Sequence, residues 1–203
     1  ADFPWRTAQQ IEIAGIPTLA LRINYVGELG WELHPAMADL PALYEAVWAA
    51  GEEHGIADFG LYAMNSLRME KGYRGWGAEL TNEVTMLEAD MARFYASAKD
   101  DFAGKAATET NEAGPVRLVY FEVEAEDADV RGGEPIFLGD TCVGVTTSGG
   151  YGYAVEKSLG FGYVPPEQAE PGSVIDIGLL DARCRATVLA EPIYDPANER
   201  LAS

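Results

Sequence analysis

The sequence predicts an α+β fold that ends in a small β-barrel or sandwich, and two observations support it. The first part of the chain reads strand, strand, helix, helix, which is typical of α+β domains. After residue 115 helical periodicity is scarce, and short strand-like runs alternate with Gly-rich or Asp-rich turns. The stretch from Lys99 to Gly114 is rich in Ala, Thr, Asp and Glu and reads as a connection. We therefore expect two domains, over residues 1–100 and 115–203.

The chain is expected to open with strands. Apolar residues alternate with polar ones on both sides of a break at residues 15–17: Ile11 and Ile13 before it, then Leu19, Leu21, Ile23 and Tyr25. A turn at residues 27–30 leads into a second run, Trp31 to His34, in which Glu32 and His34 share a face. We expect a hairpin whose turn end brings Tyr25 and Glu32 close together.

Two helices and a set of short strands follow. Asp39 is a candidate N-cap, and the first helix has an apolar face with helical spacing, formed by Leu40, Leu43, Tyr44, Val47 and Trp48. A second helix is expected from about Leu61 to Lys71. The later strands are expected at residues 116–123, 134–137, 142–147, 159–164, 174–177 and 184–189. Ser148-Gly149-Gly150 is interpreted as a hairpin turn, since neither a helix pattern nor a Lys-Ser/Thr pair follows it.

Charge and residue usage exclude several classes of function. The 203 residues carry a formal net charge of −19, which repels phosphate backbones and anionic lipid headgroups. No apolar run approaches the ~20 residues of a membrane helix, and no signal peptide is apparent. Cys142 and Cys184 are expected to be free thiols, and His34 and His54 lack partners at metal-ligand spacing. We expect a cytoplasmic protein with no nucleic-acid, membrane or metal site.

Three stretches of the sequence resemble one known family. Residues 24–33, Asn-Tyr-Val-Gly-Glu-Leu-Gly-Trp-Glu-Leu, resemble the Tyr-x-Gly-Glu-x-Gly-x-Glu hairpin of the folate-binding aminomethyltransferase (glycine-cleavage T-protein) family. Residues 65–72 are similar to its Ser-Leu-Arg-x-Glu-x-Gly helix, and their continuation to Gly77 resembles the subgroup fused to flavin dehydrogenases of dimethylglycine and sarcosine. Residues 148–153 and 157–164 resemble its C-terminal barrel.

The resemblance implies a fold and a reaction. The fold would be the later part of a ferredoxin-like folate-binding α/β module, followed by the small barrel. The cofactor would be tetrahydrofolate, with FAD only in a fused or partner flavoprotein domain or subunit. In the complete enzyme the flavin would oxidise a small N-methyl amine to an iminium, and folate would trap the carbon as 5,10-methylenetetrahydrofolate. The protein would chiefly orient the reactants and exclude water.

The resemblance also assigns folate contacts to Glu32, Tyr25, Arg68 and Tyr194. A carboxylate can accept from the amino group and the ring N–H of a pterin edge at once, and an aromatic ring can cover its flat face. By the residues alone, Glu32 is an exposed strand carboxylate and Tyr25 a core aromatic. Arg68 is either half of a salt bridge that braces the hairpin or a cationic site for the folate tail. Glu28 reads as a solvated turn residue.

Two features separate this chain from the family pattern. An Arg that serves the folate site of the glycine-cleavage branch falls on Met64, which argues against that branch. The family's catalytic Asp belongs to a segment upstream of the hairpin, and we expect the chain to start after that segment, so no catalytic residue is named. The chain is either a natural subunit or a piece of a longer protein. The alternatives are a stand-alone aminomethyl or methyl transferase and a non-catalytic folate-binding module.

Overall fold

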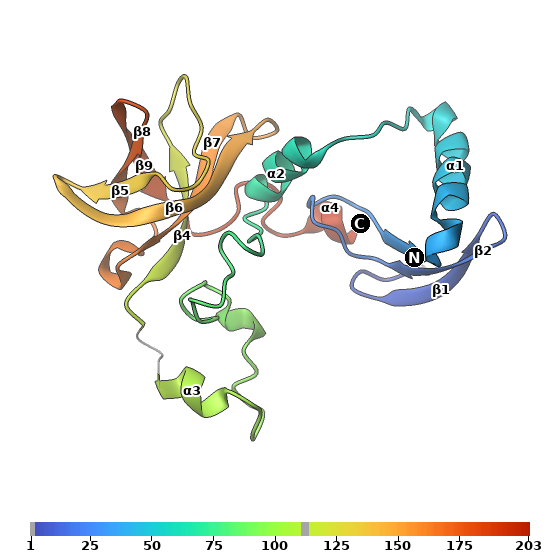
Figure 1. Cartoon of the computed structure of the whole chain (residues 1–203), viewed down its shortest axis with the longest axis horizontal. Helices are drawn as coiled ribbons and strands as arrows, with labels where there is room; N and C mark the ends of the chain where they lie inside the picture. Colours follow the sequence, from blue (N-terminus) through green and yellow to red (C-terminus); the bar gives the residue numbers. More distant parts are fainter. Residues whose placement is uncertain (1–2, 111–113) are drawn as a thin grey trace. The chain divides into compact units, whose positions relative to one another are not determined.

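The computed structural model describes residues 3–110 and 114–203 (Figure 1). They form two compact units: unit 1 is Ala1–Met64 with Asp195–Ser203, and unit 2 is Asn65–Tyr194. Residues 111–113 of the predicted connection lie outside the described residues, and the part before them includes a helix, α3 (Lys105–Thr110). The predicted domain division at residues 100–115 stays a prediction.

Unit 1 contains a three-stranded antiparallel sheet and a helix. The strands are ordered β1 (Ala8–Ile13), β2 (Ile16–Leu21), β3 (Glu32–Pro35). The 3₁₀ turn η1 (Met37–Asp39) leads into α1 (Leu40–Gly51), and η2 (Glu52–His54) follows it. Asp39 occupies the N-cap position without a side-chain capping bond. Of the predicted apolar face of α1, Leu43 is buried and Val47 and Trp48 are half-buried, whereas Leu40 and Tyr44 are exposed.

The last residues of the chain belong to unit 1. A short helix, α4 (Glu199–Ala202), ends the chain, and its Leu201 is 4% exposed. Among the described residues of unit 1, the buried apolar side chains are those of Ala20, Leu43 and Leu201. This small set means that a distant part of the sequence supplies a substantial share of the core of unit 1.

Unit 2 is built around a closed antiparallel barrel of six strands in the described residues (Figure 1). The α2 helix (Leu61–Glu70) confirms the predicted second helix, and its residues from Asn65 on belong to this unit. In the sequence, η3 (Ala92–Phe94) lies between α2 and the first barrel strand. The strand order is β4-β7-β6-β5-β8-β9. The bounds are β4 (Arg117–Val123), β5 (Pro135–Leu138), β6 (Thr141–Gly152), β7 (Lys157–Val164), η4 (Pro166–Gln168), β8 (Val174–Leu179) and β9 (Ala182–Val188).

The barrel interior is filled by alternate side chains from its strands. A cluster of buried apolar side chains from β4, β5, β7, β8 and β9 forms this core. Its members include Val119, Phe121, Ile136, Val164, Ile175 and Ile177. Closure leaves no unpaired edge in such a sheet. The α+β fold class with a small C-terminal barrel is therefore confirmed.

Two local predictions were wrong. The hairpin strand does not extend to Tyr25: β2 ends at Leu21, which pairs with Glu32, so residues 22–31 form a loop rather than a tight turn. Ser148-Gly149-Gly150 lies inside β6 and not in a turn. Glycine at position 149 reflects close packing against Val130 and not a turn.

Candidate functional site

The predicted folate residues of unit 1 lie on and next to the loop at residues 22–31. Glu32 is the first residue of β3, and Tyr25 lies within the loop, where it is half-buried. The strand pairing of Leu21 with Glu32 closes the base of this loop. The sequence motif therefore forms a loop and the strand that follows it, with Glu32 at their junction.

Glu32 presents its carboxylate on an exposed face. Its side chain retains 45% of its surface, and one carboxylate oxygen lies 3.3 Å from Nε2 of His34. Glu32 and His34 point to the same exposed side of β3, as predicted, while Leu33 between them is half-buried. A partly solvated carboxylate with this geometry can accept hydrogen bonds from a planar group with two adjacent donors.

Arg22 is a buried cation at the start of the loop at residues 22–31, and the sequence reasoning missed it. It directly follows β2 and is 4% exposed. Its guanidinium donates 2.6 Å to the carbonyl of Phe3 and also donates to the carbonyl of Ser203. It lies 5.6 Å from the ring centroid of Trp31, the residue before Glu32. Arg22 thus connects the loop to residues near both ends of the described chain. The sequence feature that could have indicated it is a single cationic residue directly after a run of strand-like residues.

Arg68 lies in a buried network of unit 2. It is 5% exposed, and its guanidinium contacts the carboxylate of Glu79 at 3.2 Å. It also donates to the Asn65 amide oxygen, the Tyr73 carbonyl and the Ser148 hydroxyl, at 3.0, 3.0 and 2.8 Å. The ion pair joins α2 to the segment after it and to β6. Arg68 as a folate contact stays a prediction, and its bonds in this structure are internal to unit 2.

Glu79 was also missed by the sequence reasoning, and it is fully buried. Its carboxylate accepts from the Gly75 amide and the Thr147 hydroxyl, both at 2.6 Å, and from the Ser148 hydroxyl. The Tyr163 hydroxyl donates 2.7 Å to the Glu79 backbone carbonyl. Burial, and then the negative charges of Glu79 and Glu88, raise the pKa of Tyr163 to about 12, so its hydroxyl remains a donor at neutral pH.

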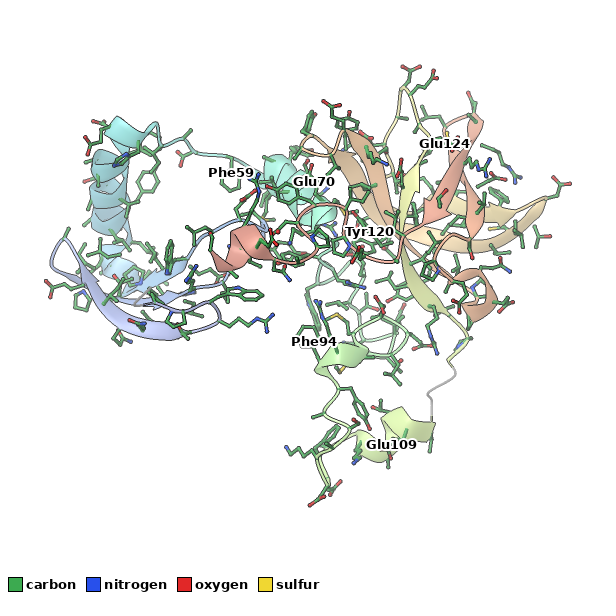
Figure 2. All side chains as sticks on the ribbon, turned by 180° about the vertical axis from the view of Figure 1, so that it is seen from behind. Phe59, Glu70, Phe94, Glu109, Tyr120 and Glu124 are labelled. Atoms are coloured by element: carbon green, nitrogen blue, oxygen red, sulfur yellow. The ribbon has the colours of Figure 1, made fainter. Side chains whose placement is uncertain are left out.

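Glu70 and Tyr194 meet at the end of α2. The Glu70 carboxylate accepts from the backbone amides of Ala154 and Val155, at 2.7 and 3.3 Å. The Glu70 carbonyl accepts from the Tyr194 amide at 3.2 Å, and the Tyr194 side chain is half-buried. Figure 2 shows Glu70 on α2 beside the barrel. The structure therefore places Arg68 and Tyr194 in unit 2, and Tyr25 and Glu32 in unit 1.

Two further findings concern residues 3–110 and 114–203. No group of three His, Cys, Asp or Glu side chains there is placed to hold a metal ion. The helices of these ranges are all too short or too polar to cross a membrane.

Comparisons with known proteins identify the family. The family model of the GCVT N-terminal domain matches residues 1–99, and that of the glycine cleavage T-protein C-terminal barrel domain matches residues 117–195. The mitochondrial dimethylglycine dehydrogenase of Mus musculus is 42% identical over 98% of this chain and 24% of its own length. The mitochondrial sarcosine dehydrogenase of Mus musculus is 34% identical over 98% of this chain and 23% of its own.

A solved structure has the same fold. The glycine cleavage system aminomethyltransferase T of Bartonella henselae superposes with a TM-score of 0.80 at 24% identity, over 88% of this chain and 50% of that one. The chain thus spans about a quarter of the length of the two dehydrogenases and half of this structure. Because both family models match, over residues 1–99 and 117–195, the chain belongs to the glycine-cleavage T-protein family.

Proposed function

We propose that this chain is the tetrahydrofolate-binding part of a one-carbon-transfer enzyme of the dimethylglycine or sarcosine dehydrogenase type. The observation that carries the proposal is the 42% identity over 98% of the chain to about a quarter of a dimethylglycine dehydrogenase. The remaining length of such a protein would hold the flavin domain and the residues that act on the amine. The chain would supply folate-binding residues and the barrel, with domains over residues 1–100 and 115–203.

The chemistry of Glu32 fits a pterin ring. A pterin offers an exocyclic amino group next to a ring N–H, which a carboxylate can accept together in one plane. Glu32 is negative, partly solvated and fixed at its backbone by the pairing with Leu21. We infer that it anchors the pterin, and that Tyr25, on the adjoining loop, covers a face of the ring. Folate roles for Arg68 and Tyr194 remain predictions of the family resemblance.

Calorimetric titration with 5-formyltetrahydrofolate, a reduced folate that resists oxidation, tests the assignment. We expect the purified chain to bind and Glu32→Ala to bind ten- to a hundredfold more weakly, because a charge-assisted contact is worth about 1.5–3 kcal/mol. The matched control is Glu12→Ala, which removes an exposed carboxylate from β1 of the same sheet and should leave affinity unchanged.

The outcomes separate two levels of the proposal. Equal affinity of Glu32→Ala and the unchanged chain would refute Glu32 as the anchor and leave folate binding intact. Absence of binding by a chain with a native circular dichroism spectrum would refute folate binding by these residues alone.

The proposed whole reaction has its own test. A polypeptide that joins this chain to its flavoprotein part should reduce an electron acceptor with dimethylglycine or sarcosine as substrate. With tetrahydrofolate added, the released carbon should appear as 5,10-methylenetetrahydrofolate instead of free formaldehyde. Formaldehyde release that is unaffected by tetrahydrofolate would contradict the proposed role in one-carbon transfer.

A further inference from the structure

The loop at residues 22–31 is held by hydrogen bonds from one of its own side chains to its backbone. The side chain is that of Asn24, one residue before Tyr25. The Asn24 amide oxygen accepts from the backbone amides of Val26 at 3.0 Å and Gly27 at 2.8 Å. Its amide nitrogen donates to the backbone carbonyl of Glu28. One side chain thus bonds to three backbone groups on the far side of Tyr25.

These bonds constrain the loop on both sides of its apex. Asn side chains that bond to their own backbone two residues on hold the chain in a turn. Here the turn continues through Gly27, whose φ of 78° is in the left-handed region that glycine adopts without strain. The third bond, to Glu28, holds the return path toward β3. The loop is therefore fastened to Asn24 from Val26 to Glu28.

Gly30 provides an independent observation of the same arrangement. A Cβ atom at Gly30 would lie 3.2 Å from the Asn24 amide nitrogen, which is tighter than ordinary van der Waals contact. The Asn24 amide thus packs directly against the backbone two residues before Glu32. The Asn24 side chain therefore bonds to the start of the segment between Tyr25 and Glu32 and lies close to Gly30 near its end.

We propose that Asn24 is a positioning residue for folate binding, which acts by holding the loop that carries Tyr25 and leads to Glu32. The inference rests on the proposed function and adds a residue to it that does not itself contact the folate. A loop of this length without internal bonds would sample many conformations, and binding would then have to order it. Asn24 orders it in advance through its own amide group.

The test compares two substitutions at this position. Asn24→Ala removes all three bonds, and we expect about a tenfold loss of affinity for 5-formyltetrahydrofolate. Asn24→Asp keeps an oxygen that can accept from Val26 and Gly27, but it replaces the donor to Glu28 with a second oxygen that faces the Glu28 carbonyl. We expect its affinity to lie between those of Asn24→Ala and the unchanged chain. Hydrogen exchange at the Val26 and Gly27 amides should accelerate in Asn24→Ala, with the paired amides of β2 unchanged.

A double-mutant cycle shows whether Asn24 acts through Glu32. If it does, Asn24→Ala should weaken binding far less in a Glu32→Ala background, because the positioned contact is already gone. Equal loss in the unchanged chain, in the Glu32→Ala background and in a Tyr25→Ala background would overturn the inference. So would unchanged affinity of Asn24→Ala in a chain whose binding depends on Glu32, a result that leaves the proposed function standing. If Asn24→Ala does not fold, unchanged affinity of Asn24→Ser, with its shorter side chain, overturns the inference in the same way.

Discussion

Arg68 and Glu79 form an ion pair from which water is almost excluded: their side chains are 6% and 0% exposed. A buried carboxylate is stable only where charge and hydrogen bonds replace its hydration. Glu79 receives both, from Arg68, from the Gly75 amide and from two hydroxyl groups of β6. The pair therefore gives Arg68, the arginine of the family-like motif, a role in stabilising the fold.

Removal of one partner should be strongly destabilising. We expect Arg68→Ala to lower the free energy of unfolding by about 3–5 kcal/mol, because Glu79 would stay buried without its counter-charge. Urea unfolding measures the change. Lys157→Ala is the matched control: it breaks the Lys157–Glu122 pair, whose side chains are 40% and 31% exposed, and should change stability by less than about 1 kcal/mol. Similar losses in both variants would contradict the structural role of Arg68.

Glu134 makes stability depend on acid pH. Burial by itself would raise the pKa of Glu134, but bonds from the Thr146 hydroxyl and the amides of Arg131 and Gly132 outweigh burial and lower it. A carboxyl whose pKa is lowered by folding stabilises the protein above its unfolded pKa and ceases to do so as pH falls through the folded pKa. Glu134→Gln should therefore be less stable than the unchanged chain at pH 7, with the difference shrinking below about pH 4.5. Denaturant midpoints at pH 7 and pH 3 test this, and a constant difference would contradict it.

At the scale of elements, β6 depends on glycine where the sequence suggested a turn. The strand carries Ser148, whose hydroxyl accepts from Arg68, and it passes Val130 at close range. A Cβ atom at Gly149 would lie 2.5 Å from the Val130 Cβ and 2.6 Å from its carbonyl oxygen. Gly149 therefore permits close packing of β6 against Val130.

Gly149→Ala should destabilise the barrel. We expect about 1–3 kcal/mol, because neither the Val130 backbone nor its Cβ can move aside without a shift of its segment. Gly150→Ala is the control on the same strand: its Cβ would meet only the end of the Asn65 side chain, at 3.1 Å. Thermal unfolding of the two variants measures the contrast. Equal effects would show that packing against Val130 does not select glycine.

At the scale of the whole molecule, the chain returns to its first unit at its end. Asp195–Ser203 belongs to unit 1, where Leu201 is 4% exposed and the Ser203 carbonyl accepts from Arg22. Because few apolar side chains are buried in unit 1, each contributes a large share of its stability. The proposed folate loop therefore depends on residues from both ends of the sequence.

Leu201→Ala should destabilise unit 1 selectively. We expect a loss of about 2–5 kcal/mol, the usual range for a buried leucine. Leu180→Ala is the matched control, since Leu180 is 88% exposed and its removal should change stability by less than about 0.5 kcal/mol. Hydrogen exchange resolves the location: amides of β1–β3 should exchange faster, and those of the barrel should not. Unchanged protection of β1–β3 would contradict the role of Leu201.

The sequence by itself indicated most of the helices and strands, because that information is local, but it did not indicate α3 or α4. The helical spacing at Leu40 to Trp48 and the alternating burial along β8 follow from the repeats of the helix and the strand. The motif residues likewise suffice to indicate the family, because each motif is a short run of neighbouring residues. Tyr25 was placed in the strand because the alternation of apolar residues continues beyond Leu21, the last residue of β2 that pairs with β3. Such alternation does not indicate where strand pairing ends.

Only the tertiary structure decided which polar residues are buried and bonded to other parts of the protein. Arg68 and Glu79 are 11 residues apart in sequence, and their shared contact, Ser148, is 80 residues from Arg68. No local pattern predicts such a meeting, since it depends on how α2 approaches the barrel. The same holds for Arg22, which donates hydrogen bonds to Phe3 and Ser203, near opposite ends of the chain. Burial and pairing of charge are properties of assembled elements, and they appear only once distant segments have come together.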